Sequence, residues 1–285
     1  MIGNIKKTTE ILNKYGLSVK KSFGQNFLID ENILRKIVNV SKITKEDGVI
    51  EIGPGIGALT EHLLKNAKKV LAYEIDTRMI EVLETELKDY DNLKIINEDV
   101  LKIDQVYDEN YFKECKRVVI VSNLPYYITT PIISKLLLNE PKIEEMYLMV
   151  QKEVGLRLSG KPKTKDYNAL SVFMAYLSEC RVEFDVSRNC FLPAPNVNSV
   201  VISIKRIERE ITVNNESHFL KFIQNIFIQR RKTFVNNLSK AYKIDKEKVM
   251  DILRRNGYKE SLRSEELSLE EIYKLYKEIF TSPYN

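Results

Sequence analysis

The stretch Ser122-Asn123-Leu124-Pro125-Tyr126-Tyr127-Ile128 holds the residues best suited to chemistry in this chain. The Asn123 side-chain oxygen and the Leu124 carbonyl can accept both hydrogens of one exocyclic amine, and Pro125 stiffens the backbone there. Such acceptors localise the lone pair of a weak nucleophile such as adenine N6 and aim it at an electrophilic methyl group. Tyr126 can stack on the base that carries the amine. The stretch therefore indicates methyl transfer to adenine N6, and the alternative is a turn whose tyrosines pack in the core.

A base paired in a helix cannot reach such a pocket, so the target must be single-stranded or extruded, at a cost of a few kcal/mol. Phe191, in Phe191-Leu-Pro193-Ala-Pro195, can supply the second face of an aromatic sandwich around the base. The alternative is that Phe191 is an ordinary core residue, and the pattern alone leaves both interpretations open.

A glycine-rich loop, Gly53-Pro-Gly55-Ile-Gly57-Ala58, follows an apolar run and precedes a helical pattern. Glycines let the backbone turn tightly and approach a ligand, with a helix N-terminus behind it. The spacing also fits the dinucleotide fingerprint. The loop alone therefore predicts a nucleoside cofactor without separating NAD from S-adenosylmethionine, and a plain strand-to-helix turn stays open.

Two acidic residues follow the next two predicted strands. Glu74 comes about twenty residues after Gly55, where a carboxylate can accept hydrogen bonds from both ribose hydroxyls. Asp99, in Asn97-Glu-Asp-Val100, is placed for the adenine amine of the cofactor. An alternative role for Asp99 is a helix N-cap. Acids ending two successive strands favour a cofactor with one nucleoside, hence S-adenosylmethionine.

Short apolar runs alternate with amphipathic segments, which predicts a doubly wound, parallel α/β sheet. Two later β-rich runs are joined by a short proline-containing loop, which suits antiparallel neighbours. The seven predicted strands are Val49–Ile52, Val70–Tyr73, Leu93–Ile96, Val118–Val121, Met146–Val150, Arg181–Val186 and Ser199–Lys205.

The pattern changes after Arg206 to three helical segments, at about 218–239, 246–256 and 268–279. The charged segment Ile207–Glu216 is the predicted hinge. We therefore expect two domains, residues 1–206 with the sheet and residues 207–285 as a small all-α domain.

Composition narrows the class of protein. With 285 residues and 44% hydrophobic composition, the chain can build a core without disulfides. The three cysteines form no C-x-x-C pair, and neither His62 nor His218 has metal-ligand spacing, so we expect no metal. Because no apolar run approaches the roughly 18 residues of a membrane span and the start lacks an apolar signal region, we expect a cytoplasmic protein without a membrane partner.

The net charge of +5 permits a polyanionic partner. Between Lys221 and Lys259, eleven Lys and Arg residues face three acids. Such a run is more often a solvated face, so on its own it does not assign a partner.

These motifs together resemble the small-subunit ribosomal RNA adenine N6,N6-dimethyltransferases, over nearly the whole chain. The pieces that carry the resemblance are Lys21-Ser-Phe-Gly-Gln-Asn-Phe-Leu28, Glu51-Ile-Gly-Pro-Gly55, Asn123-Leu-Pro-Tyr126, Phe191-Leu-Pro-Ala-Pro195 and Gln229-Arg-Arg-Lys-Thr233. The resemblance implies a Rossmann-like class I methyltransferase fold and S-adenosylmethionine as cofactor. It assigns the cofactor pocket to Asn26, Leu28, Gly53, Glu74, Asp99 and Asn123, beside Gly55 of the loop.

Related families define the alternatives. Enzymes that methylate large-subunit RNA and confer macrolide resistance typically carry Asn-Ile-Pro-Tyr or Asn-Ile-Pro-Phe, whereas Asn123-Leu-Pro-Tyr-Tyr-Ile-Thr-Thr-Pro131 looks like the small-subunit branch. Mitochondrial transcription factors keep the fold but act by binding nucleic acid. A non-catalytic RNA-binding assembly factor is therefore a further alternative, against which the intact Asn123–Tyr126 motif argues. A nicotinamide dehydrogenase is another alternative, but this chain shows no evident acid-base residue for hydride chemistry.

With this resemblance, the cluster Arg230-Arg231-Lys232 is expected to contact RNA phosphates, which supply affinity but little sequence information. Recognition is then of RNA shape. The expected partner is small-subunit ribosomal RNA in a ribosomal subunit precursor, with two adjacent adenines dimethylated by a monomeric enzyme.

Overall fold

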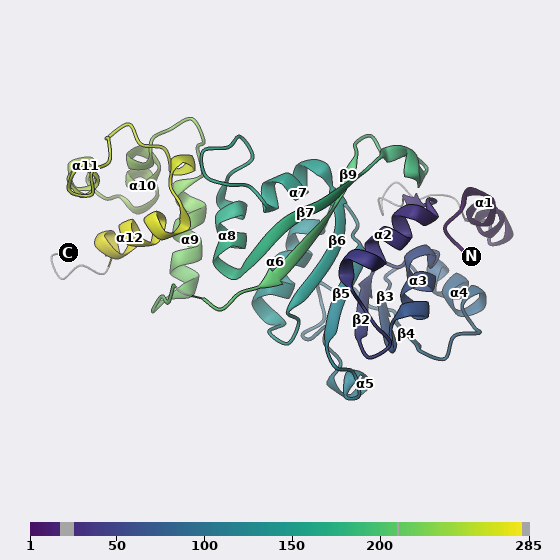
Figure 1. Cartoon of the computed structure of the whole chain (residues 1–285). Coiled ribbons are helices and arrows are strands. Elements are labelled where there is room, and N and C mark those ends of the chain that lie inside the picture. The colour runs from purple at the N-terminus through teal and green to yellow at the C-terminus, as the bar shows by residue number, and fades with distance from the viewer. Residues whose placement is uncertain (18–25, 210, 281–285) are drawn as a thin grey trace. The chain divides into compact units, whose positions relative to one another are not determined.

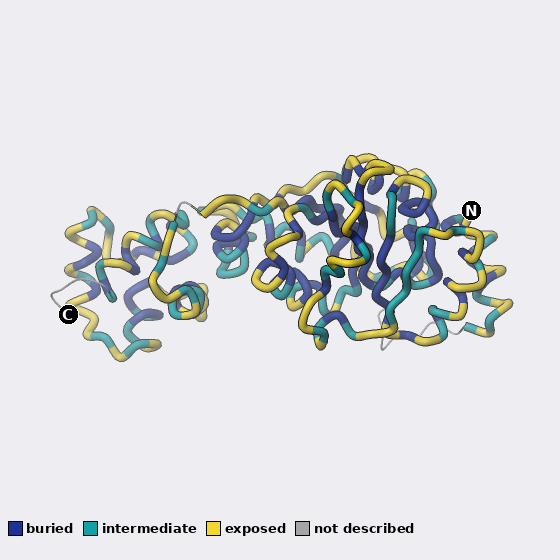
Figure 2. The backbone as a smooth tube through the Cα atoms, turned by 90° about the horizontal axis from the view of Figure 1, so that it is seen from below, coloured by how far each residue is buried: buried dark blue, intermediate teal, exposed yellow. Residues whose placement is uncertain are grey.

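The computed structural model describes residues 1–17, 26–209 and 211–280, which form two compact units (Figure 1). The first unit comprises Met1–Gly155 and Arg181–Arg206, and the second comprises Leu156–Cys180 and the chain from Ile207 onward. In both, buried segments gather inside and exposed segments surround them (Figure 2). The structure thus groups Leu156–Cys180 with the helical unit, whereas the sequence patterns place it before a single boundary at residue 206.

The first unit is built on a seven-stranded sheet of order β4-β3-β2-β5-β6-β9-β7. Strands β2 to β6 are parallel, and β9 is antiparallel to β6. The strands are β2 (Gly48–Ile52), β3 (Lys69–Tyr73), β4 (Leu93–Ile96), β5 (Val118–Asn123), β6 (Glu145–Gln151), β7 (Ser178–Val186) and β9 (Ser199–Arg206). The predicted seven-stranded, mostly parallel sheet is therefore confirmed.

A separate two-stranded ribbon pairs β1 (Phe27–Leu28) with β8 (Phe191–Leu192) in antiparallel register. Phe27 lies opposite Leu192, and Leu28 lies opposite Phe191. The ribbon joins a segment before the first sheet strand to the proline-containing loop that precedes β9.

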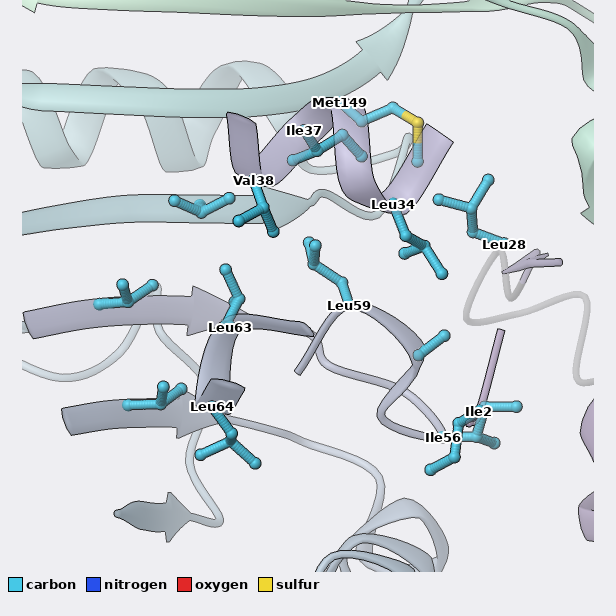
Figure 3. Close-up of a cluster of buried hydrophobic side chains, with 14 of the residues drawn as sticks. Ile2, Leu28, Leu34, Ile37, Val38, Ile56, Leu59, Leu63, Leu64 and Met149 are labelled. Atoms are coloured by element: carbon cyan, nitrogen blue, oxygen red, sulfur yellow. The ribbon is translucent and has the colours of Figure 1, made fainter. Parts of the chain in front are cut away.

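Helices and alternate strand residues form the core of the first unit. Leu34 and Ile37 of α2 and Leu63 of α3 pack in one buried cluster (Figure 3). The strands supply every second residue to it, such as Val119 and Val121 of β5, as the strand period of two requires. The helices are α1 (Ile5–Lys14), α2 (Glu31–Ser41), α3 (Ala58–Asn66), α4 (Thr77–Glu86), α5 (Glu109–Phe112), α6 (Thr129–Asn139) and α7 (Lys152–Leu158), which leads into the second unit, with a 3₁₀ turn at Arg188–Cys190.

Strand order places a crevice at the carboxyl edge of the sheet. From β2 the chain goes to β3 and β4 on one side, and then returns to β5 on the other. Ligands of open α/β sheets bind outside the strand ends at such a switch point. The segments that follow β2, β3, β4 and β5 therefore meet at one edge.

The second unit consists of helices, but the pattern predicted as one helix over 218–239 is two. The helices are α8 (Ala169–Leu177), α9 (Glu216–Ile226), α10 (Phe234–Tyr242), α11 (Lys246–Arg255) and α12 (Leu269–Phe280), with a 3₁₀ turn at Ser264–Glu266. Side chains cap the break: Asn237 Nδ2 and Ser264 Oγ donate to the Ile226 carbonyl at 2.8 and 2.6 Å, and Thr233 caps the start of α10. The cluster Arg230-Arg231-Lys232 consequently lies in a turn.

Helix α8 explains why its segment belongs to the helical unit. Its Tyr176 ring makes an edge contact with Phe219 of α9, with ring centroids 5.3 Å apart.

Within the described ranges, no helix combines the length and the apolar character needed to cross a membrane.

Candidate active site

A cavity of about 190 Å³ opens at the carboxyl edge of the parallel strands. Its walls come from β1 and from the segments after β2, β3, β4 and β5. The structure brings together here all the residues that sequence assigned to the cofactor and four of the five assigned to the base. Those lining the cavity are Asn26, Leu28, Gly53, Gly55, Glu74, Asp99, Asn123, Leu124, Pro125 and Tyr126.

The glycine loop adopts a backbone that other residues rarely take. Gly53 and Gly55 have φ values of +69° and +57°, a region that costs an L-residue energy. A side chain at Gly55 would also stand 3.4 Å from the Phe27 ring. The loop can therefore approach a ligand closely, with the N-terminus of α3 behind it.

Glu74 ties the end of β3 to this loop. Its carboxylate accepts hydrogen bonds from the Gly55 N–H at 3.1 Å and from the Asp76 N–H at 2.8 Å. The residue is 6% exposed, and this burial raises the pKa of Glu74 while the backbone donors oppose the rise. A carboxylate has about four lone-pair positions, so this one retains acceptors for hydroxyl groups in the cavity.

Asp99 caps a turn, and among the described residues no helix follows it directly, so the N-cap alternative is wrong in its literal form. Its Oδ1 accepts from the Leu101 N–H at 3.0 Å, a local turn, and its Oδ2 lies 3.9 Å from Lys102 Nζ. The same residue lines the cavity. The turn thus fixes a carboxylate at the wall.

The backbone beside the acceptors proposed for the amine is held in place, and among the described residues the acceptors themselves take part in no hydrogen bond. The Leu124 N–H donates to the Met149 carbonyl at 3.1 Å, and the Pro125 carbonyl accepts from Ile128 and Thr129. Within the residues that the structure describes, hydrogen bonds use neither the Asn123 side-chain oxygen nor the Leu124 carbonyl. Both oxygens belong to residues of the cavity wall and are available as acceptors.

Two adjacent tyrosines differ in setting. The Tyr126 hydroxyl shares a hydrogen bond of 2.6 Å with Ser199 Oγ, and burial raises the pKa of Tyr126, so it stays protonated at neutral pH. Tyr127 is 56% exposed and also lines the cavity. Burial, helped by the charges of Asp99 and Glu74, raises the pKa of Tyr127. Sequence reasoning missed Tyr127, although its place within the motif was the available signal.

Phe191 does not lie where it could stack on a base in the cavity. The side chain is 3% exposed in the hydrophobic core, and the residue pairs with Leu28 across the ribbon. The residues that line the cavity do not include it. Of the two interpretations of Phe191, the structure favours the core residue.

The structure describes only part of the segment that is expected to cap the cofactor. Asn26 and Leu28 line the cavity. The preceding part of the motif, from Lys21 to Gln25, lies outside the described residues.

In the second unit, the basic residues separate into paired and unpaired groups. Arg230 Nε is bound to Glu265 at 2.9 Å. Arg231 and Lys232 are exposed, without an acidic partner in the described ranges. Four lysines without such partners line a surface hollow between α10 and α11, which we name the lysine hollow: Lys232, Lys240, Lys243 and Lys246.

The two histidines occupy structural positions. His62 is buried in α3, where burial lowers its pKa, and His218 Nδ1 lies 2.9 Å from the Tyr276 hydroxyl. Across the described ranges, no three His, Cys, Asp or Glu side chains cluster as metal ligands.

Comparison with known proteins agrees with this geometry. A family model described as ribosomal RNA adenine dimethylase matches residues 16–280. A relative from Geobacillus sp. (strain WCH70), named ribosomal RNA small subunit methyltransferase A, is 48% identical over 271 residues, 93% of each chain. A relative of the same name from Bacillus mycoides (strain KBAB4) is 48% identical over 93% of this chain and 92% of its own.

Two solved structures share the fold over most of the chain. A dimethyladenosine transferase from Plasmodium falciparum has a TM-score of 0.72 at 28% identity, covering 89% of this chain and 97% of its own. The 23S rRNA methyltransferase ErmE has a TM-score of 0.68 at 25% identity, covering 88% and 98%. The family model spans nearly the whole chain, so this chain belongs to the ribosomal RNA adenine dimethylase family.

Proposed function

We propose that this chain transfers methyl groups from S-adenosylmethionine to the N6 amines of adenines in small-subunit ribosomal RNA, dimethylating two adjacent ones. The observation that carries the proposal is the pair of unused acceptors, Asn123 Oδ1 and the Leu124 carbonyl, in the same cavity as Glu74 and Asp99. An amine donor and a nucleoside cofactor can then meet in one cavity.

The wall of the cavity fits an adenosine-containing cofactor. Glu74 retains lone pairs for two ribose hydroxyls, and the fixed carboxylate of Asp99 can accept from an adenine amine. Asn26, Leu28, Gly53 and Gly55 supply the remaining wall. When bound, the cofactor supplies an electrophilic methyl group on a sulfonium.

The chain's own residues prepare the nucleophile. Asn123 Oδ1 and the Leu124 carbonyl accept the two N6 hydrogens, which localises the lone pair and stabilises the positive charge that develops on nitrogen. Because the pKa of Tyr126 is raised, this residue acts as a neutral stacking surface and not as a base. Catalysis is then mainly positioning and electrostatic stabilisation.

The small subunit is favoured over the large one by the relatives. Those at 48% identity are named small subunit methyltransferases, whereas ErmE, named for 23S rRNA, is 25% identical. A non-catalytic assembly factor has no need of an intact amine-binding motif beside a cofactor cavity.

RNA docking belongs to the helical unit in this proposal. Arg231 and the lysine hollow, whose wall also includes Asp245, offer cations without an ion pair to a described acid, while Arg230 is engaged by Glu265. Lysines bind phosphates as point charges and recognise RNA shape more than sequence. We propose that the enzyme acts as a monomer in the cytoplasm, on a ribosomal subunit precursor.

The choice of substrate is tested by offering labelled S-adenosylmethionine with unmethylated small subunits and, separately, with large subunits. The proposal expects label in small-subunit RNA only. Label in large-subunit RNA would assign the chain to the macrolide-resistance type. No transfer to either, with intact RNA binding, would favour the assembly factor.

A further inference from the structure

A hydrogen bond joins the Asn123–Tyr126 motif to β9, two strands away from β5 in the sheet. The Tyr126 hydroxyl lies 2.6 Å from Ser199 Oγ, and the two residues are 73 positions apart in sequence. Ser199 begins β9 opposite Gln151 of β6, and its exposed fraction is 0%. The contact therefore depends on the sheet register, which holds Ser199 on the rigid β6–β9 pair.

Two contacts restrain the ring of Tyr126, one at each end of the side chain. Its backbone end is fixed by the turn in which Thr129 Oγ1 donates to the Pro125 carbonyl at 3.1 Å. Its hydroxyl end is fixed by Ser199. A tyrosine has only two side-chain torsions, so anchoring the atom farthest from the backbone selects one orientation of the ring. A buried Ser199 hydroxyl without this partner would be unsatisfied, which favours the bonded arrangement.

We propose that Ser199 is a positioning residue for methyl transfer: it holds the Tyr126 ring at the angle at which the target base stacks on it. The inference rests on the proposed function of Tyr126 as the stacking surface. A base that stacks at the wrong angle places its amine away from Asn123 and Leu124, and small misplacements cost large factors in rate. Ser199 touches neither base nor cofactor in this role.

The competing interpretation is that the bond only stabilises the sheet, and β9 offers a matched control for it. Ser203 is also buried on β9, with 4% exposed, and its hydroxyl donates to the Glu183 carboxylate. Ser203→Ala removes one hydrogen bond of a buried serine from the same strand without touching Tyr126. A purely structural role predicts that Ser199→Ala and Ser203→Ala behave alike.

The test compares Ser199→Ala, Ser203→Ala, Tyr126→Phe and the double variant of Ser199 and Tyr126 in the full chain, with Ser199→Thr as the conservative variant. We expect Ser199→Ala to lower kcat by about tenfold or more. S-adenosylmethionine affinity should be unchanged, because Ser199 does not line the cavity. The double variant should lose no more than the single ones, since each removes the same bond. Threonine should restore most of kcat, and Ser203→Ala should leave it unchanged.

A second readout follows the base itself. Small-subunit RNA carrying 2-aminopurine at a target adenine should be quenched by stacking in the wild type and in Ser203→Ala, and quenched less in Ser199→Ala. Equal quenching with wild-type kcat in Ser199→Ala would overturn the inference. A loss of cofactor binding in Ser199→Ala would overturn it as well, because the effect would then be damage to the cavity. A wild type that transfers no methyl groups would instead refute the proposed function.

Discussion

The Glu74 carboxylate accepts a hydrogen bond from the Gly55 N–H at 3.1 Å, so the same residue shapes the glycine loop and faces the cavity. Removing the Glu74 carboxylate should weaken cofactor binding in two ways, because it takes away hydrogen-bond acceptors and loosens the glycine loop. We expect Glu74→Ala to weaken S-adenosylmethionine binding by about 2–3 kcal/mol, or about 30- to 150-fold, the scale of hydrogen bonds to a charged group. Calorimetry measures it directly.

Glu140 provides the control for this substitution. It is also a buried carboxylate that accepts from two backbone N–H groups, those of Val106 at 2.6 Å and Tyr107 at 3.3 Å, but it does not line the cavity. Glu140→Ala should lower the melting temperature with unchanged cofactor affinity. Wild-type affinity in Glu74→Ala would refute its assignment.

Asn123 should act chiefly in the transition state, because its acceptor stabilises charge that appears only as the methyl group moves. We expect Asn123→Ala to lower kcat by about 100-fold or more, with a smaller loss of cofactor affinity. Asn92→Ala is the matched change, since the Asn92 side chain donates to the Leu64 and Ala67 carbonyls and does not line the cavity. An Asn123→Ala variant with normal kcat at saturating cofactor and RNA would remove this residue from the mechanism.

Glu51 should make stability depend on pH. Burial raises the pKa of Glu51 from about 4.5 to about 8. The folded state therefore keeps a proton that the unfolded state has lost between those values, and stability falls as pH rises through this window. The loss is on the order of a few kcal/mol. Glu51→Gln removes the titration, so its melting temperature should fall less than that of wild type between pH 5 and pH 9. Parallel curves for both proteins would show that Glu51 is charged in the fold.

Docking on RNA should depend on the cations that lack acidic partners. We expect replacement of the four lysines of the lysine hollow by Gln to reduce methylation of structured small subunits. The salt slope should flatten by about 0.7–0.9 per lost phosphate contact. A short adenine-containing oligonucleotide should be affected much less, and cofactor binding should survive.

Arg254→Gln controls for the loss of charge, because Arg254 already binds Glu247, Asp251 and Glu260 and should contribute little to docking. We expect neutralising Arg231 and Lys232 to matter more than neutralising Arg230, which Glu265 holds. An equal loss on structured and short substrates would point to damage in the catalytic unit and contradict docking by this surface.

Much of the sheet follows from local patterns. Apolar runs bounded by turn residues marked every sheet strand, and the run Leu93–Ile96 coincides with β4. Most other strands extend one or two residues further, because backbone pairing with a neighbour continues where apolar residues stop. Gly53, Glu74, Asp99 and Asn123 were recognisable for a similar reason, because each lies at or shortly after the end of a strand. Asn26 and Leu28 were assigned only from the family resemblance.

What sequence patterns missed depends on distant side chains. The break between α9 and α10 is stabilised in part by Ser264, nearly forty positions beyond Ile226, so the periodic pattern ran through it as one helix. Phe191 looked available for a base, yet pairing of β8 with β1 buries it. The partner of Tyr126 likewise follows only from the register that brings Ser199 to its hydroxyl.

The central claim, that adenine N6 is the methyl acceptor, is tested most directly by digesting small-subunit RNA to nucleosides after reaction with isotopically labelled S-adenosylmethionine and separating the products by mass. The account predicts label in N6,N6-dimethyladenosine with wild type and almost none with Asn123→Ala. Label on a ribose, on another base or on a ring nitrogen of adenine would contradict it.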